Sequence, residues 1–131
     1  MSIAAFHTAF QALLTPASEF KTAIGGHFYY DGNVPADLAL PYAAWLTVYC
    51  EPVGVFAADV SERMVQVDVY AAKMGDAVTL ADKALALFDG KEVAGAGLTP
   101  WRFQRESVRG PMKDEACWRM SLEFIVTSED V

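Results

Sequence analysis

The side chains that could carry out chemistry are few and far apart in this sequence. It contains two histidines, His7 and His27, and two cysteines, Cys50 and Cys117. Neither histidine has a cysteine or carboxylate at the spacing that zinc sites use, so both are interpreted as surface or capping residues. Cys117 has no neighbouring base in the sequence that would activate a thiolate. We therefore expect no catalytic residue, no metal site and no cofactor.

Two further patterns resemble functional sites, but neither has the residues that such a site needs. Gly95-Ala96-Gly97 is glycine-rich like a phosphate-binding loop, but it lacks the Gly-Lys-Ser/Thr that should follow and a helix to carry it. Asp68 lies on the mixed face of a predicted strand, where a cross-strand pair with an arginine is the plainer explanation. Both patterns favour a structural protein over an enzyme.

Composition limits the class of protein. A chain of 131 residues with 53% hydrophobic and 21% charged residues fits one globular domain spanning residues 1–131. No apolar run approaches the about 20 residues of a membrane helix. Residues 1–14 lack the pattern of a signal peptide, so a cytoplasmic product with two free thiols is expected. The net charge of -7 argues against specific nucleic-acid binding, which needs clustered Lys and Arg.

The clearest structural pattern is a strand followed by a helix. Between Arg63 and Ala71 the valines alternate with Met, Gln, Asp and Tyr, as in a strand with one aliphatic face. Asp76 is the expected N-cap of a helix that runs to Phe88, with Asp89-Gly90 as its end. The predicted helical face comprises Val78, Ala81, Leu85 and Phe88.

The remaining patterns complete an α+β fold. We expect a single domain with a mainly antiparallel sheet and two or three helices packed on one face. The predicted elements are helices over Ile3–Leu14 and from Thr15-Pro16 to Ile24, strands over Phe28–Tyr30, Tyr42–Cys50, Trp101–Val108 and Cys117–Thr127, and a turn at Gly110-Pro111. Tyr42–Cys50 should pair antiparallel with Arg63–Ala71. Val67, Leu85, Phe88, Leu122 and Phe124 should be buried.

A surplus of apolar residues gives the candidate interface. Trp45 and Tyr49 alternate away from Ala44, Leu46 and Val48, and Val55-Phe56 lies in the connection between two strands. Three helices cannot easily cover both faces of a sheet, so Trp45, Tyr49, Val55 and Phe56 are predicted to contact a neighbouring subunit. The alternative for Val55-Phe56 is a hairpin whose strands simply extend further.

Three segments carry a resemblance to a known family. They are Arg63 with Gln66–Tyr70 and the helix from Ala77 to Gly90, Ile24–Tyr29 followed by Leu40-Pro41-Tyr42, and the closing Trp118–Phe124. In this order, from about Phe6 to Thr127, the chain resembles the phage tail-completion, or tail-terminator, family of minor tail proteins. His27 departs from the small or basic residue expected at its position.

The resemblance implies a structural role in virion assembly. It implies an α+β subunit that forms a ring homo-oligomer, a hexamer by the family pattern, ends the tail tube and joins it to the head. The implied partners are other copies, the tail-tube protein and the head–tail connector protein. The protein would reside in the virion tail and, during assembly, in the host cytoplasm. The alternative function is a small-molecule-binding or enzymatic α+β module whose aromatic pocket is lined by Trp45, Tyr49, Tyr70 and Trp101.

Overall fold

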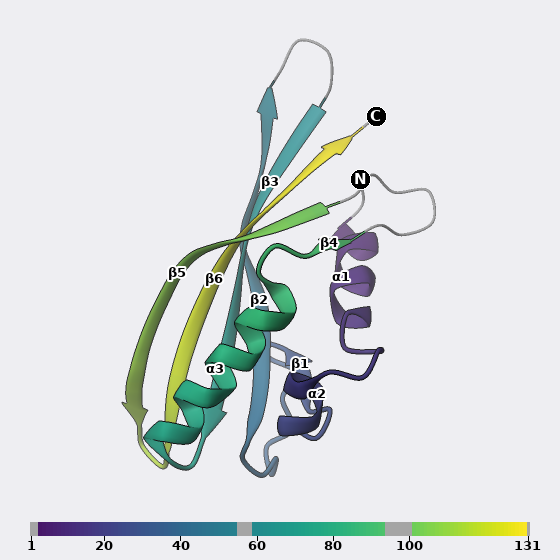
Figure 1. The fold of residues 1–131 in the computed structure, drawn as a ribbon. Coiled ribbons are helices and arrows are strands. Elements are labelled where there is room, and N and C mark those ends of the chain that lie inside the picture. The colour runs from purple at the N-terminus through teal and green to yellow at the C-terminus, as the bar shows by residue number, and fades with distance from the viewer. Residues whose placement is uncertain (1–2, 55–58, 94–100, 131) are drawn as a thin grey trace.

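The computed structural model describes residues 3–54, 59–93 and 101–130 as three helices and one six-stranded sheet (Figure 1). The elements in chain order are α1 (Ile3–Ala12), α2 (Glu19–Ala23), β1 (Phe28–Tyr30), β2 (Tyr42–Gly54), β3 (Asp59–Ala71), α3 (Met74–Phe88), β4 (Glu92–Val93), β5 (Trp101–Asp114) and β6 (Cys117–Asp130). The strand order is β1-β2-β3-β6-β5-β4. Only the β1–β2 pair is parallel. The predicted α+β class is confirmed.

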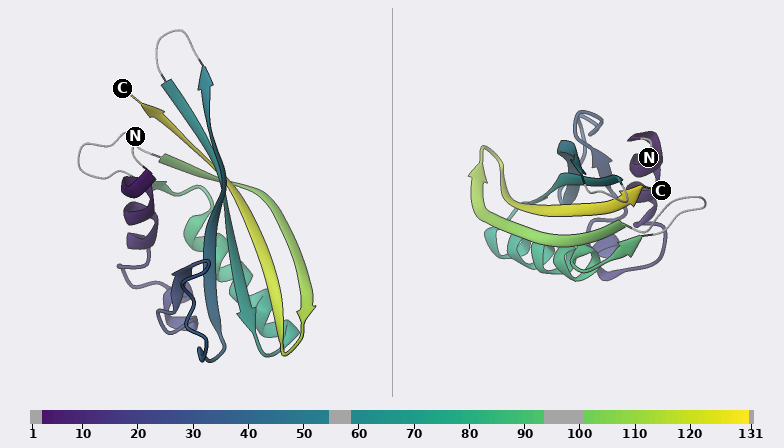
Figure 2. Two further views of the ribbon diagram at one scale, coloured as in Figure 1. Left: turned by 180° about the vertical axis from the view of Figure 1, so that it is seen from behind. Right: turned by 90° about the horizontal axis from the view of Figure 1, so that it is seen from above.

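The helices pack against one face of the sheet. Seen from behind, none of the described helices lies in front of β3, β6 and β5 (Figure 2). The long helix α3 runs obliquely along the other face, and α1 stands beside the end of the sheet formed by β1 and β2. The sheet therefore has a covered face and an open face.

The core between the covered face and the helices is rich in aromatic rings. Phe10 of α1 lies at its centre, with ring centroids 4.3 Å from Trp45, 5.4 Å from Phe88 and 5.5 Å from Phe103. Valines of β3 and the apolar side chains of β6 complete the core from the sheet side. Of the five residues predicted to be buried, four have no exposed area: Val67, Phe88, Leu122 and Phe124. Leu85 is only partly buried and packs at the edge of the core.

The central hairpin is longer than predicted. β2 and β3 pair antiparallel as expected, and the pairing continues past Cys50 to Gly54 opposite Asp59. One bulge interrupts it at Val48, between Thr47 and Tyr49. The extended-strand alternative is therefore confirmed up to Gly54 and from Asp59. Val55 and Phe56 themselves lie outside the described residues.

The predicted start of α3 and one residue of its predicted buried face are wrong. The helix α3 begins at Met74, with Lys73 as its N-cap, so Asp76 lies inside the first turn. There its carboxylate still interacts favourably with the positive end of the helix dipole. Lys73 makes no side-chain hydrogen bond to the helix. Because lysine is not a typical capping residue, the sequence does not mark this position as the start of the helix. Val78 is 38% exposed and not part of the buried face.

The strand β5 also extends beyond its predicted end. Gly110-Pro111 was expected to form a turn, but β5 continues through this dipeptide to Asp114, and the reversal occurs after it. The register shifts twice, between Arg105 and Ser107 and between Arg109 and Met112. These bulges absorb the extra residues without ending the strand. The other helices are shorter than expected: α1 ends at Ala12, and α2 begins after the N-cap Ser18.

Candidate interaction surfaces

The structure places Trp45 in the core rather than on an uncovered face. Its side chain is 1% exposed, and its Nε1 donates a hydrogen bond to Gln11 Oε1 at 2.9 Å. The register explains the burial, because Trp45 lies opposite Val67 on the covered face. Alternation correctly separates Trp45 from Ala44 and Leu46, but it does not say which of the two faces the helices cover.

The other predicted interface residues lie along the projecting hairpin or beyond its described part. Tyr49 belongs to β2 and pairs with Met64 of β3, directly after the bulge. The hairpin that carries Tyr49 extends beyond the helices (Figure 1). The structure thus separates Trp45, a core residue, from the hairpin segment that carries Tyr49.

A shallow groove lies where α1 meets β1 and β2. The imidazole of His7 rests against Tyr30 and Trp45, with ring centroids 4.4 and 4.7 Å apart. Gln11 spans the groove floor, because its Nε2 donates to the Phe28 carbonyl oxygen at 2.8 Å while its Oε1 accepts from Trp45. These contacts attach α1 to the sheet. His7 is therefore a packing residue, partly buried rather than fully at the surface.

The groove does not match the predicted aromatic pocket. Trp45 contributes to its lining, but Tyr70 does not. Tyr70 follows Val67 by three positions on β3, so it points to the opposite face of the sheet. Trp45 and Tyr70 therefore do not line one common pocket.

The open face of the sheet carries a row of hydrogen-bonded polar side chains. Asp68 is 6% exposed and accepts from Ser121 Oγ at 2.6 Å and from Gln66 Nε2 at 3.0 Å. A serine and a glutamine thus donate the hydrogen bonds expected from an arginine, while, against the effect of burial, the charge of Asp68 together with that of Asp114 still raises the pKa of Arg119. Farther along the face, Arg109 Nη2 lies 2.7 Å from Glu123 Oε1. Each carboxylate has its partner within the sheet, so this row stabilises the strand pairing.

Tyr70 and Arg119 extend the polar row toward the β5–β6 turn. Burial, and secondly the charge of Asp68, raise the pKa of Tyr70 to about 12, while its hydrogen bond with Arg119 acts in the opposite direction. Arg119 Nε lies 3.4 Å from Asp114 Oδ2. A phenol with this pKa stays protonated at neutral pH and is unsuited to act as a base.

The remaining chemical candidates have ordinary structural surroundings. Burial, followed by the charge of Asp114, raises the pKa of the Cys117 thiol, which disfavours a reactive thiolate. His27 Nδ1 lies 3.1 Å from the Tyr29 hydroxyl. No group of three or more metal-ligating side chains occurs among the described residues. In that same part of the chain, no helix is long and apolar enough to cross a membrane.

Sequence reasoning missed two residues that organise these surfaces. Gln11 holds α1 to both β1 and β2, and Ser121 holds Asp68. The signal for Ser121 was present, because it lies between Met120 and Leu122 and therefore on the polar face of β6, opposite Asp68 of β3. For Gln11 there was none, because its partners are 17 and 34 residues away in the sequence.

Comparisons with known proteins agree with this architecture. The model of a family described as "Tail completion protein gp17" matches residues 8–129. No curated protein matches the chain. Among solved structures, a chain from the virion of the native gene transfer agent particle superposes with a TM-score of 0.71 and 20% identity, covering 98% of this chain and 99% of that one. At this identity, the likeness concerns the fold.

Proposed function

Because the chain belongs to the tail completion protein gp17 family, we propose that it forms a ring that ends the phage or prophage tail tube and joins it to the head connector. The chain is a structural tail protein and not an enzyme, as the sequence resemblance implied. The observation that carries the proposal is the family match over residues 8–129, nearly the whole described chain.

The proposed partners are protein surfaces. They are other copies of the chain, six to a ring by the family resemblance, together with the tail-tube protein and the head–tail connector protein. Subunits would assemble in the host cytoplasm before they enter the virion. The net charge of -7 fits a ring through which DNA passes, because a cationic lumen would retain the phosphates. No specific nucleic-acid or membrane contact is proposed.

The proposed contacts between subunits involve the hairpin of β2 and β3. Tyr49, Val55 and Phe56 remain the candidate interface residues, whereas Trp45 is withdrawn because its side chain is fully used in the core. Support comes from the pairing of β2 with β3 as far as Gly54 and Asp59, which carries this segment beyond the helices. Apolar side chains on such a projection would be exposed to water unless a neighbouring subunit covers them.

The experiment that tests this proposal replaces the two apolar residues of the connection. A Val55→Ser, Phe56→Ser variant should keep the melting temperature nearly unchanged but yield tails of uncontrolled length, or tails not joined to heads, in electron micrographs. A Val55→Ile, Phe56→Tyr variant is the matched control and should assemble normally. If the serine variant unfolds, the two residues belong to the core. If it assembles normally, the interface lies elsewhere.

A further inference from the structure

The outer edge of the short strand β1 lies in the groove beside α1. On the inner side, the chain around β1 bonds to β2 through the Asp31 N–H at 2.8 Å and the His27 carbonyl oxygen at 3.0 Å. Backbone groups alternate in direction along a strand, so both backbone groups of Tyr29 also face β2. The N–H and C=O groups of Phe28 and Tyr30 therefore point outward, away from the sheet.

Three of these four outward groups have partners within the chain. The Phe28 N–H donates to the Gly26 carbonyl oxygen at 3.0 Å. The Tyr30 carbonyl oxygen accepts from the Asn33 N–H at 2.9 Å. The Phe28 carbonyl oxygen accepts from Gln11 Nε2 at 2.8 Å. The fourth group, the Tyr30 N–H, has no partner among the described residues, and Tyr30 lines the groove.

The Phe28 C=O and the Tyr30 N–H, which we call the β1 edge, are complementary to the same two groups of a second copy. When two β1 strands meet antiparallel with Tyr29 opposite Tyr29, Phe28 of each copy lies opposite Tyr30 of the other. Residues paired in this way exchange hydrogen bonds, and the Tyr30 N–H of each copy then faces the Phe28 carbonyl oxygen of the other. Such a self-complementary contact is what a two-fold axis requires.

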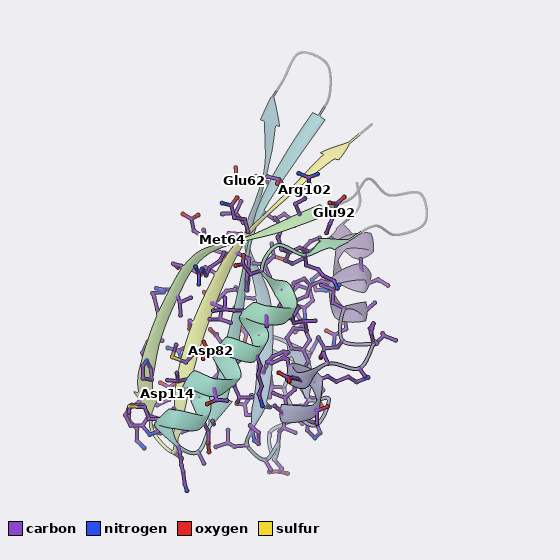
Figure 3. The ribbon with its side chains drawn as sticks, in the orientation of Figure 1. Glu62, Met64, Asp82, Glu92, Arg102 and Asp114 are labelled. Atoms are coloured by element: carbon purple, nitrogen blue, oxygen red, sulfur yellow. The ribbon has the colours of Figure 1, made fainter. Side chains whose placement is uncertain are left out.

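The side chain of Gln11 occupies half of this edge. Its Oε1 accepts from Trp45 Nε1 at 2.9 Å, and an indole N–H can only donate, so the orientation of the amide is fixed. Its Nε2 is thereby directed at the Phe28 carbonyl oxygen. The Gln11 amide thus takes the position that the N–H of an added strand would need. Side chains bridge the space between α1 and the sheet (Figure 3).

The groove gives this edge no protection of the usual kind. Its volume of about 810 Å³ leaves room for another chain. None of the described residues that line it is Asp, Glu, Lys, Arg or Pro. Charged side chains and prolines are the common means by which proteins keep strand edges from pairing with other chains. Apart from the shortness of β1, which spans three residues, the protection here comes from Gln11.

We propose that Gln11 keeps the β1 edge of the free subunit closed to pairing with β1 of a second copy. The inference goes beyond the proposed ring and does not depend on it, because the ring contacts are assigned to the hairpin of β2 and β3. A subunit with this edge closed can assemble through other surfaces without forming side-to-side pairs.

The test removes the amide and follows the exchange of single backbone amides with deuterium by NMR in the full chain. In the unmodified chain, the Tyr30 amide should exchange rapidly at every protein concentration. In Gln11→Met it should become protected at least about tenfold as the concentration rises, because the freed edge pairs with a second copy. The Tyr29 amide, which faces β2, should stay protected in both proteins and reports that β1 is intact. Because Gln11 is exposed, the melting temperature should change by only a few degrees.

A matched control adds the same side chain to the same groove. Thr8 is exposed on α1 and lines the groove, so Thr8→Met adds equal apolar surface while Gln11 stays in place. Its Tyr30 amide should exchange as in the unmodified chain. If Gln11→Met loses the protection of Tyr29, Gln11→Asn takes its place, because its shorter amide cannot span both Trp45 and Phe28. The same protection of Tyr30 is expected for Gln11→Asn.

Three results would overturn the inference. The first is a Tyr30 amide that exchanges equally fast in the Gln11 variants and in the unmodified chain up to the solubility limit. The second is self-association of these variants without protection of Tyr30, which would place the contact elsewhere. The third is equal protection in Thr8→Met, which would assign the effect to added apolar surface. A failure of the proposed ring would leave the exchange of Tyr30 unchanged, so the two proposals fail separately.

Discussion

Phe124 of the central strand contacts Phe88 of α3 across the boundary between sheet and helix, with ring centroids 5.9 Å apart and neither ring exposed. Truncation to alanine would leave a cavity that surrounding rings fill only in part. We predict that Phe124→Ala lowers the free energy of unfolding by about 3–5 kcal/mol. Urea-induced unfolding measures this loss.

The neighbouring residue provides the control for this prediction. Ile125 pairs with Met64 on the open face and is partly exposed. Ile125→Ala should therefore cost clearly less than Phe124→Ala. A loss below about 1 kcal/mol for Phe124→Ala would place this ring at the surface and contradict the assignment of the covered face.

Tyr70 makes the stability of the fold depend on pH at the alkaline end. Its pKa is raised from 10.0 to about 12 in the folded chain, so the unfolded chain loses the phenolic proton first. The neutral phenol thus contributes stability that is present below about pH 10 and is lost as the pH rises to about 12. Tyr70→Phe has no proton to lose and should show a shallower decline in this window. Equal pH slopes for both proteins in urea titrations would contradict the burial of this phenol.

At the level of the elements, alternation and helical spacing predicted most strands and helices. The stripe from Trp118 to Val126 was recognised as the longest apolar face, and β6 is indeed central in the sheet. The prediction failed where an element continues through a residue that usually ends one. Gly75-Asp76 lies inside α3, and Gly110-Pro111 lies inside β5. At Gly110-Pro111, pairing with β6 on both sides of the bulge outweighs the local preference for a turn.

Gly110 shows the physical reason for one of these failures. Its φ is +114°, and a Cβ at this position would lie 2.8 Å from the Arg119 carbonyl oxygen on the adjacent strand. The glycine is thus required by close strand approach at a bulge, rather than by a turn. We predict that Gly110→Ala destabilises the fold by about 1–3 kcal/mol.

Gly75→Ala is the opposite case and serves as the comparison. A Cβ there meets no atom within 4 Å, and the residue lies in the first turn of α3. It should be neutral or stabilise the helix by up to about 1 kcal/mol. If thermal unfolding shows the two alanine variants to be equal, strand approach does not explain the conformation of Gly110.

At the level of the whole molecule, the sequence predicted the fold class and the family but assigned Trp45 to the wrong face. Which face of a strand is buried depends on where the helices pack, and that is decided by contacts such as Gln11 with Trp45, 34 residues apart. The exposure of Met74, Val78 and Val108 was missed for the same reason. Met74, Val78 and Val108 follow regular patterns, and only the position of α3 leaves them exposed.

The assignment to a phage tail is confirmed by the family match, whereas the ring is a proposal. Fold and family follow from the chain alone, whereas a ring depends on a second copy. The ring is therefore tested on the assembled tail.

The most direct test of the central claim is electron microscopy of tails assembled with and without this protein. The account predicts that tails made with it have uniform length and end, at the head-proximal side, in a ring of this chain. Tails made without it should vary in length and remain unattached to heads. Tails of normal length, joined to heads in the absence of the protein, would contradict a role in ending the tail tube.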